Sequence, residues 1–107
     1  MLVLNVTDHT FTAEVWQSEV PVLVDFWAPW CGPCRLMLPI VEAVATQLAD
    51  RARVVKVNVD EARATAAEMG VTSIPSFLVI HGGEVLQRFS GVVSKNRLLE
   101  VLNPLLS

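Results

Sequence analysis

The stretch Trp30-Cys31-Gly32-Pro33-Cys34 holds both cysteines of this 107-residue chain. A disulfide between them would close so short a loop that its entropic contribution to stability is about 2 kcal/mol, against roughly 3 kcal/mol for a fifteen-residue loop. Such a bridge is a weak crosslink, but it can open and close with little backbone movement. We expect Gly32 to let the backbone turn between the sulfurs, and Pro33 to occupy the first turn of a following helix, where no N–H is needed. The pair therefore predicts thiol–disulfide exchange.

Other uses of a cysteine pair fit the sequence less well. A structural zinc site usually requires four Cys or His ligands, and only His9 and His81, far apart in the sequence, accompany the two cysteines. A c-type haem attachment would need a histidine directly after the second cysteine, where Arg35 stands. Packed core cysteines are common, but that interpretation leaves the Gly-Pro between them unexplained. We expect no metal and no bound cofactor.

Composition is typical of a small globular protein, and we expect a single domain over residues 1–107. Hydrophobic residues make up 52% of the chain and charged residues 18%, so it can bury a core and is not disordered. A net charge of −3 without a Lys/Arg stripe argues against nucleic-acid binding. No apolar run is long enough to cross a bilayer, and the start does not resemble a signal peptide. With no cysteine left for a structural disulfide framework, we expect a reducing cytoplasm. We also expect a monomer.

The pattern of apolar residues predicts strands that alternate with helices. Strands are expected at 2–6, 21–27, 53–59, 76–81 and 85–90, and helices at 11–18, 34–50, 60–69 and from 95 to 102 or beyond. Gly82-Gly83 indicates a hairpin between the last two strands, and Ser94 is expected to cap the last helix. This order predicts an α/β fold, a central mixed sheet of about five strands with helices on both faces.

In this arrangement the cysteine pair falls where a strand ends and the long helix begins. A helix N-terminus stabilises a thiolate through its unpaired N–H groups and its macrodipole, and only the thiolate attacks a disulfide. Cys31 is the more N-terminal sulfur and is expected to be the more exposed, so it should be the nucleophile. Cys34, one turn inside the helix, should be buried and suited to resolving a mixed disulfide.

These and other residues, spread over essentially the whole chain, resemble the thioredoxin family. The match in order and spacing consists of Trp27 to Cys34 (Trp-Ala-Pro-Trp-Cys-Gly-Pro-Cys), Asp25, Pro39, Lys56, Ile74-Pro75 and Gly91. The chain departs from the pattern at Arg35, where the family often has Lys, and at Ser76, where Thr is usual. The resemblance implies the thioredoxin fold, with four helices flanking the sheet and with Pro75 in the cis form.

The resemblance also implies a function. A member of this family would be a general protein-disulfide reductase whose redox-active disulfide is Cys31–Cys34. Its substrates would be proteins with disulfides. Its reducing equivalents would come from NADPH through a flavoprotein, thioredoxin reductase, so that the chain itself would need no cofactor.

Asp25 is the exception in the apolar strand 21–27, because burying an ionised carboxylate is costly. The resemblance supports a general base that acts toward Cys34 through a water, and burial raises a carboxyl pKa toward neutrality. The alternative is an aspartate at the edge of the strand that faces solvent. Lys56, on the expected neighbouring strand, either faces Asp25 and tunes its charge or is a solvated lysine.

The remaining candidate residues would form the surface that meets the substrate. We expect Trp27 to pack in the core and Trp30, which lies past the strand, to be an exposed wall. The expected substrate-binding set is Trp30, Gly32, Pro33, Ile74, Pro75, Gly91 and Val92, the last two completing an apolar rim. With Pro75 cis, the Ile74 backbone would be free to pair with an extended substrate.

Three functions remain open on the sequence. The first is a dithiol reductant of protein disulfides. The second is an oxidase or isomerase on the same fold, although relatives that oxidise tend to carry His between the cysteines, where this chain has Gly-Pro. The third is a non-enzymatic binding module that uses the apolar rim around Trp30 and Pro75. Glutaredoxin fits less well, since it typically has Pro directly after the first cysteine.

Overall fold

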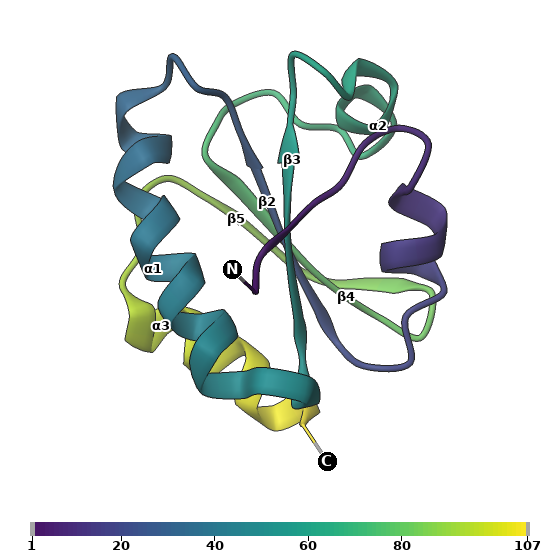
Figure 1. Cartoon of the computed structure of the whole chain (residues 1–107), viewed down its shortest axis with the longest axis vertical. Coiled ribbons are helices and arrows are strands. Elements are labelled where there is room, and N and C mark those ends of the chain that lie inside the picture. The colour runs from purple at the N-terminus through teal and green to yellow at the C-terminus, as the bar shows by residue number, and fades with distance from the viewer. Residues whose placement is uncertain (1, 107) are drawn as a thin grey trace.

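Five strands form the central sheet of the computed structural model, which describes residues 2–106. They are β1 (Leu4–Asn5), β2 (Val22–Trp27), β3 (Arg53–Asn58), β4 (Ser76–His81) and β5 (Glu84–Ser90). The order across the sheet is β1-β3-β2-β4-β5 (Figure 1). The strands β1, β3 and β2 run parallel, whereas β4 is antiparallel to both β2 and β5. The predicted mixed sheet is therefore confirmed.

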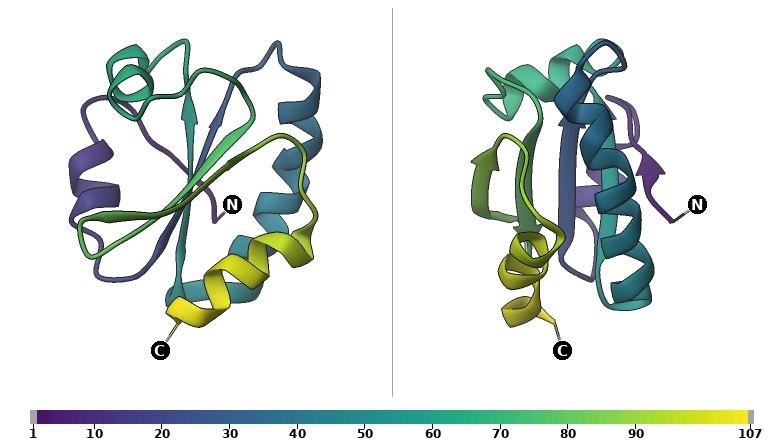
Figure 2. Two further views of the ribbon diagram at one scale, coloured as in Figure 1. Left: turned by 180° about the vertical axis from the view of Figure 1, so that it is seen from behind. Right: turned by 90° about the vertical axis from the view of Figure 1, so that its left-hand side faces the viewer.

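Helices cover both faces of this sheet. On one side lie α1 (Gly32–Leu48) and α3 (Lys95–Leu102), and on the other lie the short π-helical segment η1 (Thr12–Trp16) and α2 (Arg63–Glu68) (Figures 1 and 2). These are the four predicted helices, and single 3₁₀ turns, η2 (Ala49–Arg51) and η3 (Asn103–Leu105), follow α1 and α3. Within residues 2–106, no helix has both the length and the apolar character needed to cross a membrane.

Strand β2 is apolar on both faces because it lies in the middle of the sheet, between β3 and β4. Leu23 packs with buried residues of α1 and α3, and Val24 and Phe26 pack in the opposite core with η1 and α2. Side chains alternate along a strand, so Asp25 and Trp27 face the same side as Leu23. This alternation brings Asp25 to the face covered by α1, the helix that carries the cysteines.

Three elements are shorter than their apolar patterns predict. The first strand is confined to β1, the helix expected at 11–18 to η1, and the helix expected at 60–69 to α2. The last of these begins late because residues 58–62 form a turn on the carbonyl oxygen of Asn58, which accepts from the N–H groups of Glu61 and Ala62 at 3.1 and 2.9 Å. The first turn of α2 is capped from a distance, since Asp8 accepts from the backbone and the hydroxyl of Thr65 at 2.9 and 2.6 Å.

The predicted hairpin joins β4 and β5. Gly82 and Gly83 both have left-handed backbones, with φ of +62° and +78°. A two-residue turn with positive φ at both central positions matches the twist of the strands that it connects, and glycine adopts it without steric cost. This hairpin places Gly91, after β5, beside Pro75, before β4, since the Gly91 N–H donates to the Pro75 carbonyl at 2.9 Å.

Ser94 caps α3, as predicted, because its hydroxyl accepts from the backbone N–H of Arg97 at 3.1 Å. We expect Ser94→Ala to lower the free energy of unfolding by about 1 kcal/mol, the usual cost of losing an N-cap. Urea unfolding of the two proteins measures the difference. Ser94→Asp is the matched control, because an aspartate can accept the same hydrogen bond. An equal loss in both variants would contradict the capping role.

Candidate active site

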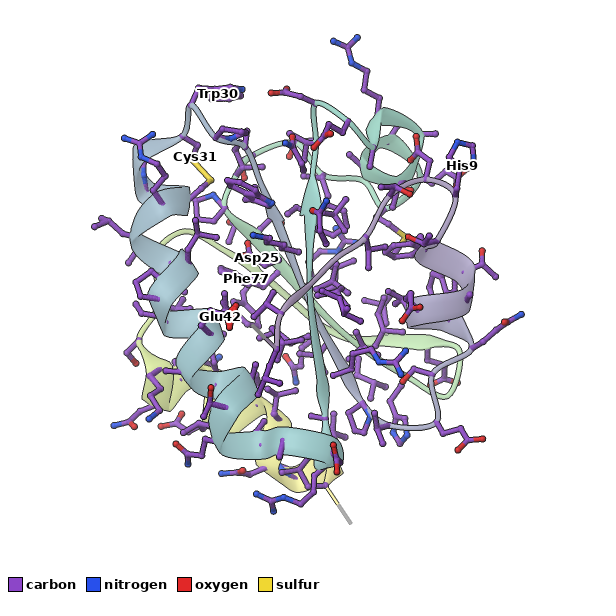
Figure 3. All side chains as sticks on the ribbon, viewed as in Figure 1. His9, Asp25, Trp30, Cys31, Glu42 and Phe77 are labelled. Carbon is purple, nitrogen blue, oxygen red and sulfur yellow. A yellow bond between two sulfur atoms is a disulfide. The ribbon has the colours of Figure 1, made fainter. Side chains whose placement is uncertain are left out.

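The disulfide between Cys31 and Cys34 lies where β2 ends and α1 begins, and their Cα atoms are 5.2 Å apart (Figure 3). Cys34 is fully buried, whereas Cys31 keeps 6% of its surface exposed. This is the order of exposure that the sequence predicts, although Cys31 is itself largely covered. Of the two cysteines, Cys31 is therefore the more accessible to a reactant from solvent.

The first turn of α1 gives Cys31 a backbone hydrogen-bond donor. Cys31 is the N-cap residue, and its Sγ accepts a hydrogen bond from the backbone N–H of Cys34 at 3.2 Å. Pro33 occupies the first turn, as expected. Gly32 does not have a positive φ, so the expectation that its conformational freedom makes the turn is wrong. The helix itself brings the sulfurs together, since residues three apart lie on one face.

Arg35 closes the active-site loop from the helix side. Its guanidinium Nη1 donates to the carbonyl oxygen of Pro29 at 2.9 Å, and its backbone N–H donates to the carbonyl of Cys31 at 3.1 Å. The side chain thus spans the loop that carries the cysteines. Its positive charge is held at the outer side of that loop, beside the thiols rather than bonded to them.

A second loop lies against Cys31. The Ile74–Pro75 peptide bond is cis, and the Ile74 carbonyl oxygen lies 3.9 Å from Cys31 Sγ. Gly91, with a φ of +88°, bonds to Pro75 and is followed by the exposed Val92. The structure therefore brings Ile74 against Cys31 and Gly91 against Pro75, at the open end of the β4–β5 hairpin.

The two tryptophans near the cysteines differ as predicted. Trp27 is partly buried and packs against the cluster of Ala28, Cys31 and Cys34. Trp30 projects into solvent above Cys31 with 67% of its surface exposed (Figure 3). Its ring is one wall of an apolar hollow of about 210 Å³, and Val59 and Ile74 line the same hollow. This hollow opens beside the cysteines.

Asp25 is fully buried at the centre of the sheet, so the alternative of a solvent-facing aspartate is wrong. Neither of its carboxyl oxygens has a hydrogen-bond partner within residues 2–106. Desolvation raises the pKa of Asp25 from its ordinary value of 3.8 to about 7, and the charge of Lys56 acts in the opposite direction. A carboxyl group in this environment can take up and release a proton near neutral pH.

Lys56 stands opposite Asp25 in the parallel pairing of β2 and β3. It is half-buried, and its Nζ lies over the ring of Trp27, 5.2 Å from the centroid. A cation over an indole face is attracted by the ring quadrupole. Lys56 is therefore not a fully solvated lysine. Its charge lowers the pKa of the neighbouring Asp25, although the contact that it makes is with Trp27 and not with that carboxylate.

Two residues of the site are absent from the sequence predictions. Asp60 accepts a hydrogen bond from the Trp30 indole Nε1 at 2.8 Å, and Asn58 accepts from the backbone N–H of Asp60 at 3.0 Å. Both follow or end β3, the strand beside β2. Since the carboxyl ends of neighbouring parallel strands meet at one edge of a sheet, polar residues directly after the strand 53–59 were the available sign. By contrast, His9 is exposed and His81 ends β4, both away from the cysteines.

A strand–turn–helix that presents a reversible disulfide at the helix N-terminus, with a proline loop against it, defines a thiol–disulfide oxidoreductase of the thioredoxin fold. Comparison with known proteins agrees. The sequence model of the Thioredoxin family matches residues 2–104. The chain belongs to the thioredoxin family.

Several similar proteins are named thioredoxin. Thioredoxin 1 of Nostoc sp. is 48% identical over 98 residues, which cover 92% of each chain. The thioredoxin of Bacillus subtilis is 44% identical over 103 residues, covering 96% of this chain and 97% of the relative. That of Rickettsia prowazekii is 43% identical over 102 residues, covering 95% and 97%. As a member of this family, the chain is a protein-disulfide oxidoreductase that works by dithiol–disulfide exchange.

Proposed function

We propose that this chain reduces protein disulfides, with Cys31 as the nucleophile and Cys34 as the resolving thiol. The observation that carries the proposal is the difference between the two cysteines. Cys31, at the helix N-cap, is the more exposed of the two at 6%, and Cys34 is fully buried. The Cys31 thiolate attacks one sulfur of the substrate disulfide, forming a mixed disulfide and releasing one substrate thiolate. The Cys34 thiolate then attacks Cys31 and releases the second. The substrate gains two electrons, and the Cys31–Cys34 disulfide forms.

Asp25 is proposed as the base for the second attack. Cys34 must lose its proton before it can attack, and it does so in a place closed to bulk water. Asp25 lies on the face of β2 that α1 covers, and its pKa of about 7 suits proton transfer at neutral pH. We propose that the proton passes through a water. Lys56, by opposing the rise in the pKa of Asp25, would set the pH at which this happens.

The substrate would lie across the two loops that meet at Cys31. Trp30, Gly32 and Pro33 form one side of the proposed binding surface, and Ile74, Pro75, Gly91 and Val92 form the other. An extended segment of substrate would pair with the backbone of Ile74 while its disulfide meets Cys31. The exposed rings and aliphatic groups at the rim would contact apolar residues that flank the substrate cysteine.

The partners of this cycle are proposed as those of the family. Oxidised chain would be recharged by a flavoprotein reductase that draws on NADPH, and no cofactor would stay bound to the chain. We propose a cytoplasmic monomer whose whole length, residues 1–107, is one thioredoxin domain.

The direction of exchange favours reduction over oxidation. A strong oxidant needs a highly stabilised nucleophilic thiolate, and here the stabilising groups are the helix start and the Arg35 charge, which is bonded to Pro29. Gly32 and Pro33 supply no side-chain donor or cation to Cys31. The dithiol should therefore give up its electrons readily.

The test is a turnover assay with NADPH, a thioredoxin reductase and insulin. The rate of NADPH oxidation should rise in proportion to the concentration of this chain. The Cys31→Ser, Cys34→Ser double mutant should be inactive. Full activity in that double mutant would instead indicate a binding module. Equilibration against glutathione gives the direction, and a reduction potential above about −200 mV, in the range of disulfide isomerases, would contradict the reductase.

A further inference from the structure

Trp30 combines high exposure with a fixed orientation. Its side chain is 67% exposed, yet its indole Nε1 donates to Oδ2 of Asp60 at 2.8 Å, across 30 residues of sequence. An indole has a single donor, and a hydrogen bond to a charged acceptor is stronger than one to a neutral group. This contact therefore selects one rotamer of a ring that would otherwise turn freely in solvent.

Asp60 is in turn held by Asn58, the last residue of β3. Asn58 is 8% exposed, and both ends of its amide are used. The Oδ1 atom accepts from the backbone N–H of Asp60 at 3.0 Å, and Nδ2 donates to Oε1 of Glu61 at 2.9 Å. An amide oxygen bonded to the N–H two residues ahead fixes the backbone of the turn. The position of the Asp60 carboxylate is thus set from the buried end of a central strand.

The ring so held completes the apolar hollow of about 210 Å³ beside the cysteines. Its other walls, which include Val59, Ala66 and Ile74, pack against the two core clusters. Trp30 differs from these three residues, because it is exposed and its orientation depends on a polar contact at the surface. If the ring turned away, the hollow would lose one side.

Resting on the proposed function, we infer that Asn58 and Asp60 are positioning residues for the substrate. Acting through the indole N–H of Trp30, they keep the hollow formed before the substrate arrives. A preformed hollow should favour substrates in which a large aliphatic side chain flanks the disulfide, because that side chain enters the hollow while Cys31 attacks. A preformed pocket avoids the cost of ordering the ring on binding.

The test uses two synthetic peptides, each with one internal disulfide, that differ only in Leu or Ala next to the attacked cysteine. In the parent chain, the Leu peptide should have the higher kcat/KM, by roughly tenfold. Asp60→Ala should reduce this preference roughly threefold or more, mainly by raising KM for the Leu peptide. Asp60→Asn, which keeps an acceptor oxygen, should retain more of the preference. Glu61→Gln removes a charge from the next residue and is the matched control.

A double-mutant cycle identifies the route of the effect. Trp30→Phe keeps an aromatic wall but removes the N–H, so Asp60→Ala should have no further effect on the preference in that background. An equal effect of Asp60→Ala in both backgrounds would overturn the inference, because Asp60 would then act by its charge or through the loop. An unchanged preference for the Leu peptide in Asp60→Ala would also overturn the inference.

Failure of the proposed function would look different. A parent chain that reduces neither peptide nor 2-hydroxyethyl disulfide would contradict the reductase itself. A parent chain that reduces all three, with the same preference in every variant, would contradict only the role of Asn58 and Asp60.

Discussion

Cys34→Ser should accumulate a stable covalent complex with its substrate, whereas Cys31→Ser should form none. In Cys34→Ser the exposed Cys31 can still attack a disulfide, but the buried position that would release the product holds a hydroxyl. Serine is a very poor nucleophile toward a disulfide at neutral pH, since its hydroxyl stays protonated where a thiol ionises. No second thiol of the chain can therefore release the substrate from the mixed disulfide. Turnover should fall to background in both variants.

Mass spectrometry under non-reducing conditions measures this directly after either variant, fully reduced, is mixed with insulin. Cys34→Ser should gain the mass of one insulin molecule, whose two chains stay joined by a second interchain disulfide, and dithiothreitol should remove it. The double mutant is the control for non-covalent binding. If a covalent complex formed with Cys31→Ser but not with Cys34→Ser, the roles of the two cysteines would be reversed. The difference in burial between the sulfurs would then not decide which one attacks.

Much of this site could be predicted from the sequence because its main parts are local. The apolar run before the cysteines fixes a central strand, and the periodicity after them fixes a helix, so the pair falls at a strand–helix junction. Gly82-Gly83 and Ser94 are equally local, since a turn or a cap depends on neighbours within a few residues. The order of exposure of Cys31 and Cys34 follows from helix geometry alone.

The parts that could not be predicted depend on contacts between distant segments. The cap that Asp8 provides to Thr65 and the bond from Trp30 to Asp60 join loops that only the fold brings together. The periodicity of apolar residues predicts the secondary structure of a segment, but it does not show which distant segments come into contact. The late start of α2 has a local cause that the apolar pattern also does not show, because the carbonyl of Asn58 holds the residues before the helix in a turn.

The burial of Lys56 could not be predicted from the alternation of side chains along a strand. Alternation along β3 gives the face to which this side chain points, but the number of atoms that cover it depends on neighbouring strands and on α1. Only the structure shows that the aliphatic stem is half-buried and that Nζ lies over Trp27. The same holds for Asp25, because its burial depends on the strands on either side of β2 and on the helix that covers them.

Asp25→Ala should make the protein more stable at pH 8 and a slower reductase. The pKa of this carboxyl is raised from 3.8 to about 7 by desolvation, so the folded protein binds the proton more tightly than the unfolded chain. As pH rises from about 4 to about 7, the unfolded chain loses the proton first, and the free energy of unfolding falls. Since one pKa unit corresponds to about 1.4 kcal/mol, this group should cost the parent about 4 kcal/mol by pH 8.

The variant lacks this pH dependence, so its gain in the free energy of unfolding over the parent should be larger at pH 8 than at pH 4 by up to about 4 kcal/mol. A cavity left by the substitution lowers the gain equally at both pH values and cancels from this difference. Urea unfolding at the two pH values measures the difference. Asp25→Asn is the isosteric control, since it removes the charge and keeps the volume. Lys56→Met should raise the pKa of Asp25 further, because the cation that opposes the rise is gone.

Turnover should fall in Asp25→Ala because Cys34 loses the group proposed to take its proton, and general bases typically contribute about 100-fold or more. The loss should be greatest near pH 7 and smaller at high pH, where hydroxide and buffer bases can deprotonate the thiol. Single-turnover reduction of insulin at several pH values, with mixed disulfide followed by mass, separates the resolving step from the first attack. The attack by Cys31 should be unaffected. An equal change in stability at pH 4 and pH 8, together with an unchanged resolving rate, would show that Asp25 is neither titrating near neutrality nor serving as the base, and the carboxyl would then have to be explained by packing alone.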